Sequence, residues 1–181
     1  MRLAVAIVPL AVLLGCKAAA PVDAGPAAAE ERARAALAPF KASLKEALLG
    51  ALKDGPEKAV EVCASAAPSL ARSASKDGVA VGRTSSKLRN PDNAPKAWLG
   101  PILAEFEKAP PGSETKKTVA LGGGRYGYAE AIWIQAPCLA CHGAAVAPSV
   151  KAALSRYPKD AATGYALGEL RGVFYAEIEP R

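Results

Sequence analysis

The stretch CLACH at residues 138–142 constrains this chain most, because it gathers two of the four cysteines and the single histidine. Two cysteines three positions apart can clamp a metal, exchange electrons as a dithiol, or attach a haem through thioether bonds. The fold has to present this stretch to whichever partner it serves. The spacing alone leaves all three chemistries open, and the rest of the chain has to distinguish them.

Zinc and dithiol chemistry each lack part of their usual setting. A structural zinc site needs four ligands, whereas this stretch offers three, two of them adjacent, so that Cys63 would have to be the fourth. A thioredoxin-like dithiol follows a strand and begins a helix within βαβ units. A strand pattern does precede residue 138, but no βαβ alternation surrounds it. An exported thiol-disulfide oxidoreductase therefore remains the weaker alternative.

A covalently attached haem uses every chemical group of the stretch. Cys138 and Cys141 fit thioether bonds to the two vinyl groups, and His142 then lies where it can bind the iron as an axial ligand. The sequence thus predicts one haem c.

The first twenty residues predict export. An apolar run over residues 3–14 follows one cation and is too short to span a bilayer, which is typical of a signal peptide. It ends in LLGC at residues 13–16, which resembles the bacterial lipobox, whose cysteine, here Cys16, carries the lipid. The alternative is an ordinary secretory signal cleaved near residues 18–20. Either reading places the mature chain outside the cytoplasm, in the periplasm or at the cell exterior, where haem c is attached.

Three segments are expected along the chain. Residues 1–15 form the lipoprotein signal peptide, residues 16–30 a flexible tether rich in alanine and proline, and residues 31–181 a single domain. A chain of 181 residues is long enough for one hydrophobic core. The net charge of +6 is modest and its cations alternate with acids, which argues against a nucleic-acid partner.

The hydrophobic patterns predict an α+β fold. Helical spacing covers residues 30–52, where Pro39 should kink or split the helix, and a second helix starts at Pro56, with Pro68 disfavouring helix near Cys63. Further elements are a strand within 77–85, a helix within 95–107, a hairpin over 116–134, a short helix within 149–157 and a strand over 171–178. This order favours an antiparallel sheet flanked by helices.

The second axial ligand is harder to find. Six-coordinate haems of this type commonly use methionine or a second histidine, but the only methionine is Met1, which leaves with the signal peptide. The remaining candidates are Cys63, a lysine, a tyrosine or water. Cys63 would be an unpaired thiol in an exported protein, although a cysteine on an apolar helix face is often only a small buried hydrophobe.

From about residue 36 onward the chain resembles a family of exported single-haem c-type domains with a PAS-like fold, long catalogued as a domain of unknown function. The matching stretches are AVEVCASAAPSLA, VGRTSSKLRNPDNAP, CLACHG and YPKDAATGYALGELRGVF. The resemblance implies haem on Cys138 and Cys141, His142 as the proximal ligand and Cys63 as the opposite one. Family members often serve as sensory inputs to kinases or chemoreceptors, so a chain ending at Arg181 would signal through a separate partner.

These observations predict a membrane-tethered haem protein that senses redox state or a diatomic gas through iron bound by His142 and Cys63. A thiolate ligand favours Fe(III), and its release on reduction would open a binding site. The alternative is a simple electron-transfer cytochrome with an unidentified redox partner. No enzyme activity is expected, because no second histidine can serve as acid or base. Arg83, Lys87 and Arg89 are either partners of the haem propionates or surface cations.

Overall fold

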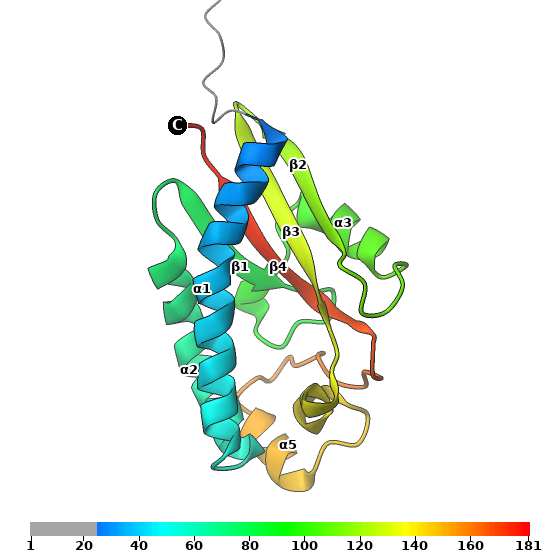
Figure 1. The fold of residues 1–181 in the computed structure, drawn as a ribbon. Coiled ribbons are helices and arrows are strands. Elements are labelled where there is room, and N and C mark those ends of the chain that lie inside the picture. The colour runs from blue at the N-terminus through cyan, green and yellow to red at the C-terminus, as the bar shows by residue number, and fades with distance from the viewer. Residues whose placement is uncertain (1–24) are drawn as a thin grey trace, which may run out of the picture.

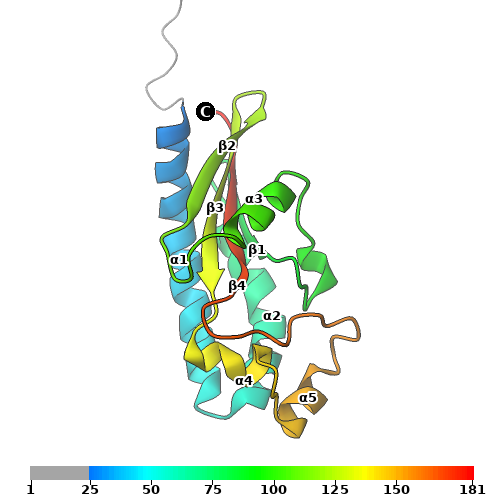
Figure 2. The same cartoon turned by 90° about the vertical axis from the view of Figure 1, so that its right-hand side faces the viewer.

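The computed structural model describes residues 25–181, and the signal peptide, Cys16 and most of the predicted tether lie outside them. A four-stranded antiparallel sheet in the order β1-β4-β3-β2 forms the centre, as the predicted α+β class requires. Helices α1 and α2 cover one face and α3 covers the other, and the cysteine segment lies at one end of the sheet (Figures 1 and 2).

Two long antiparallel helices form the first layer. Helix α1 spans Pro26–Leu52 and α2 spans Pro56–Ala74, and both start with proline, whose fixed φ suits the first helical position. The buried residues of α1 recur at helical spacing and include Leu37, Phe40 and Leu44. Because α1 begins at Pro26, residues 26–30 are helical and the predicted tether is shorter than the sequence suggested.

Both helices continue through their internal prolines, so the split expected as one outcome at Pro39 and the interruption expected at Pro68 near Cys63 do not occur. Both Pro39 and Pro68 lie on exposed faces, where the carbonyl that loses its hydrogen bond can be hydrated. The neighbouring residues Phe40 and Ala67 are buried in the core. Packing of the inner faces therefore outweighs the local cost of proline, about 3 kcal/mol in a helix interior.

The last strand in the sequence is central in the sheet. Strand β4 (Leu170–Ile178) lies between β1 (Val79–Thr84) and β3 (Arg125–Trp133), and β3 also pairs with β2 (Lys116–Gly122). Side chains of β4 alternate, so that Phe174, Ala176 and Ile178 pack under α1 and α2, whereas Val173 and Tyr175 pack against α3 (Leu99–Phe106).

The cysteine end is built from short elements. A 3-10 turn η2 (Ala136–Cys138) continues into α4 (Leu139–His142), and α5 (Pro148–Leu154) follows (Figure 2). A second 3-10 turn, η1 (Pro91–Asn93), belongs to the loop after β1. Within residues 25–181, no helix is long and apolar enough to cross a membrane.

Candidate functional site

The structure places the CLACH stretch directly after β3, where the strand turns into η2 and α4. Cys138, Cys141 and His142 are all partly buried. Cys138 packs on the small cluster of Ile134, Ala162 and Tyr165. Cys141 packs on a different cluster, formed by Val60 of α2 with residues of and before α5. The two thiols thus anchor opposite sides of one helical turn and are not joined as a disulfide.

His142 is held as a neutral imidazole with one nitrogen committed. Its Nδ1 lies 2.7 Å from the carbonyl oxygen of Ala162. A carbonyl only accepts hydrogen bonds, so Nδ1 carries the proton and Nε2 keeps its lone pair. Burial lowers the pKa of His142 to about 3, and the charges of Arg171 and Arg89 act in the same direction. This is the state in which histidine binds a metal.

An arginine clamp fixes the carbonyl that orients His142. Arg89 Nη2 donates to the carbonyl oxygens of Cys141 at 2.6 Å and of Ala162 at 3.3 Å. Arg89 Nε donates to Asp160 Oδ2 at 3.1 Å, and Asp160 Oδ1 accepts from the Ala162 backbone N–H at 2.8 Å. The clamp explains why the polar stretches around residues 89 and 160 accompany the cysteines in the sequence.

The same clamp bears on Arg89, which the sequence left open as a propionate partner or a surface cation. Its side chain is 14% exposed and that of Asp160 is 12% exposed, so this is a largely desolvated ion pair. Three protein acceptors already use the Arg89 guanidinium. Arg89 therefore serves the protein's own structure.

Tyr165 connects His142 to two further cations that sequence reasoning passed over or ranked low. Its ring lies edge-on to the His142 ring with centroids 6.2 Å apart. Lys87 Nζ lies 4.7 Å and Arg171 Cζ 5.7 Å from the centroid of the Tyr165 ring, and both distances are typical of cation-π contacts. Within the described residues neither cation forms a salt bridge, so positive charge collects beside His142.

Cys63 approaches the site from α2. It is partly buried, and burial raises the pKa of its thiol while the charges of Arg83 and Arg89 oppose that rise. Burial also raises the pKa of the Cys141 thiol, and the charge of Cys63 raises it further. Helix α2 contacts α4 and α5, so the fold brings Cys63 toward the cysteine end, and iron ligation by Cys63 stays a prediction.

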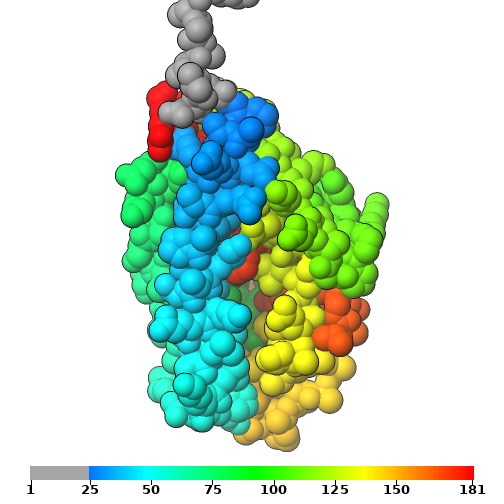
Figure 3. Space-filling view, in the orientation of Figure 1, coloured from blue at the N-terminus to red at the C-terminus, as the bar shows by residue number. Residues whose placement is uncertain are grey.

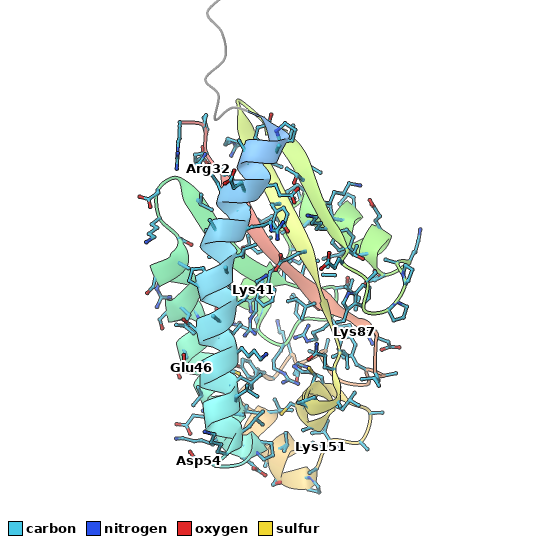
Figure 4. The ribbon with its side chains drawn as sticks, viewed as in Figure 1. Arg32, Lys41, Glu46, Asp54, Lys87 and Lys151 are labelled. Atoms are coloured by element: carbon cyan, nitrogen blue, oxygen red, sulfur yellow. The ribbon has the colours of Figure 1, made fainter. Side chains whose placement is uncertain are left out.

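The surface is hollowed between α1 and the segment running from β3 to α4, and atoms of β4 are visible at the floor of the hollow (Figure 3). Lys41 of α1 bridges to Glu130 of β3 in an ion pair, and Tyr128 donates to the same carboxylate at 3.2 Å (Figure 4). Lys41, one of the lysines open to a ligand role from sequence, is thus engaged by a carboxylate.

Zinc finds no support in this arrangement. In the part of the chain that the structure describes, no three side chains of His, Cys, Asp or Glu converge on a point that could hold a metal ion. A neutral histidine with a free Nε2 and two thiols on the same turn fit a haem better than a tetrahedral metal site.

The comparisons with known proteins agree with this architecture. The model of the Tll0287-like family matches residues 23–178. Among solved structures, the crystal structure of the cyanobacterial heme-protein Tll0287 matches with a TM-score of 0.56 and 27% sequence identity, over 80% of this chain and 92% of that chain. The comparison with curated proteins found no match.

Proposed function

The chain belongs to the Tll0287-like family, and on that premise we propose that it is a c-type haem protein whose iron lies between His142 and Cys63. The solved neighbour is a heme-protein, which supports haem as the partner of the CLACH stretch. The observation that carries the proposal is the His142 imidazole, neutral and anchored through Nδ1, with Nε2 left for the iron.

Each site residue has a distinct proposed role. Cys138 and Cys141 form the thioether bonds, and their packing on two separate clusters holds the turn rigid while they do so. His142 binds the iron from α4, and Cys63 binds it from α2. The haem itself supplies an iron that changes oxidation state and binds small ligands.

The uncompensated cations beside His142 support the fit. Haem carries two propionate carboxylates, which need cationic partners when they are partly buried. Lys87 and Arg171 share the Tyr165 ring and have no carboxylate partner among residues 25–181. We assign them, in place of Arg89, as the propionate partners.

We propose that the protein senses redox state or a small ligand by exchanging Cys63. Cys63 as a thiolate would favour the ferric iron of a bound haem, and after reduction by a redox partner a protonated Cys63 thiol would leave room for a gas such as carbon monoxide. The signal peptide and lipobox predicted at Cys16 would tether the protein to a membrane outside the cytoplasm, and a separate protein would receive the signal.

One preparation tests the haem assignment. The protein is expressed with haem-maturation machinery, and the haem is extracted with acidified solvent from wild type and from the Cys138→Ala/Cys141→Ala variant. We expect the haem to stay with the wild-type polypeptide and to be absent or extractable in the variant. Haem that is extracted equally from both would contradict covalent attachment.

Carbon monoxide then separates a sensor from a plain electron carrier. We expect the reduced protein to form a carbon monoxide adduct rapidly, because Cys63 leaves. A reduced protein that binds no carbon monoxide, yet exchanges electrons quickly, would favour the electron carrier instead.

A further inference from the structure

We propose that Arg83 binds a small monoanion beside Cys63, so that in the ferric protein the position opposite His142 prefers anionic ligands to neutral ones. This inference rests on the proposed haem function and adds the chemical class of the ligand. It also separates Arg83 from Lys87 and Arg89, with which the sequence grouped it.

Strand alternation places Arg83 on the inner face of the sheet. Val79 and Val81 of β1 are buried under α1 and α2, and Arg83 follows them at the next position on that face. Its cross-strand neighbour Phe174 packs against Phe40 of α1 on the same face. An arginine thus continues a row of core residues toward the cysteine end.

Arg83 and Cys63 face each other along α2 and β1. The chain reverses between α2 and β1, and the Val81 backbone N–H donates to Ser75 Oγ at 3.0 Å, which ties the two elements at the turn. From Val81 to Arg83 the strand advances about 7 Å, the length of about four helical residues, so the Arg83 backbone lies level with about Ala71 of α2. Cys63 lies about two turns further along α2 in the direction that β1 follows, and the guanidinium of Arg83 and the thiol of Cys63 interact electrostatically.

Arg83 has no protein counter-charge. In the structure of residues 25–181 its guanidinium forms no hydrogen bond and no ion pair, whereas the neighbouring Arg89 is satisfied by three acceptors. The titratable groups around Arg83 are Cys63, Tyr157 and Arg89, none of them a carboxylate. Arg83 is partly buried, and this burial lowers the pKa of its guanidinium.

A partly buried cation that faces inward without a partner in the protein favours an anion beside it. When Cys63 is bound as a thiolate, its negative charge balances the positive charge of Arg83. When Cys63 is absent, an added monoanion such as azide can take the same place and accept charge-assisted hydrogen bonds from Arg83. A neutral ligand of similar size gains nothing from the charge of Arg83.

The test uses the haem-loaded Cys63→Ala protein, in which no bond has to break before a ligand enters. Ferric protein is titrated with azide, an anion, and separately with imidazole, a neutral ligand, and both dissociation constants are read from the absorption spectrum. The same titrations are made with Arg83→Gln added, with Arg83→Lys added, and with Arg72→Gln added as a control on the exposed end of α2.

We expect Arg83→Gln to weaken azide binding by about tenfold or more while the dissociation constant of imidazole stays the same, because one charge-assisted hydrogen bond is lost. Arg83→Lys should recover part of the loss, and Arg72→Gln should change neither constant. If azide and imidazole change by the same factor, or neither changes, the proposal is wrong and Arg83 serves another group, such as a propionate. A Cys63→Ala protein whose ferric spectrum equals that of wild type would instead refute the proposed Cys63 ligation.

Discussion

The two ends of this molecule are held together differently. Under α1 and α2, one continuous hydrophobic cluster extends from Ala29 to Ile178 and includes Phe40 and Tyr128. At the cysteine end the apolar clusters contain only three or four buried residues each, and an arginine-aspartate clamp with loop hydrogen bonds does the rest. The first end therefore has a complete hydrophobic core, whereas the second has only small apolar clusters, to which a bound group would add contacts.

The largest effect on stability is expected in the hydrophobic core under α1 and α2. Phe40 is 2% exposed and packs edge-to-face on Phe174, with ring centroids 5.8 Å apart. Phe40→Ala should lower the free energy of unfolding by about 3–5 kcal/mol, because it leaves a cavity. Urea unfolding measures this, and Leu49→Ala, at a 45% exposed position of the same helix, should change it little. Equal losses from both variants would mean that α1 is not packed as described.

The clamp should show a smaller and more local effect. Arg89→Ala leaves Asp160 buried without its partner, which costs about 3 kcal/mol. We expect amide hydrogen exchange to accelerate at Ala162 and Tyr165 much more than at Ala176 in the sheet. Arg156→Ala, at an exposed position, should leave all three unchanged. Uniform acceleration along the chain after Arg89→Ala would show that the two ends do not differ in this way.

Removal of the haem tests the same contrast from the other side. The haem-free Cys138→Ala/Cys141→Ala protein should keep the slow exchange of the central strand β4, because its core needs no partner. Amides of residues 134–169 should exchange at least about tenfold faster than in the loaded protein, since binding stabilises only what it touches. Loss of protection in β4 as well would indicate that the sheet also depends on haem.

The smallest effect is expected near the C-terminal end of α1. Gly50 is in a helix, and an added Cβ there meets no atom within 4 Å. Gly50→Ala should raise the free energy of unfolding by about 0.5–1 kcal/mol without altering the haem spectrum. Gly112 is equally open but has a φ of 76°, so Gly112→Ala should destabilise the protein instead. Thermal unfolding of the two variants decides this.

Sequence reasoning succeeded where one short stretch determines the outcome. Pro56 begins a helix and the last strand forms near residues 171–178, both as expected, whereas Pro26 begins a helix where a flexible tether was expected. Sequence reasoning failed for Pro39, because tertiary packing of the inner face overrides the local preference. The arginine clamp could not be predicted, since its partners are 71 residues apart in the chain. The two polar stretches around residues 89 and 160 were the only signal of the clamp in the sequence, and only the fold shows that they contact each other.

The identity of the proposed iron ligand opposite His142 tests the whole account most directly. Electron paramagnetic resonance of the ferric protein measures it, on wild type and on Cys63→Ala loaded with haem to the same extent. We expect wild type to give a low-spin signal with the narrow spread of g-values typical of thiolate ligation, and Cys63→Ala to lose it and become high-spin or bind an added ligand. Identical spectra from the two proteins would contradict ligation by Cys63 and the sensor proposal that depends on it.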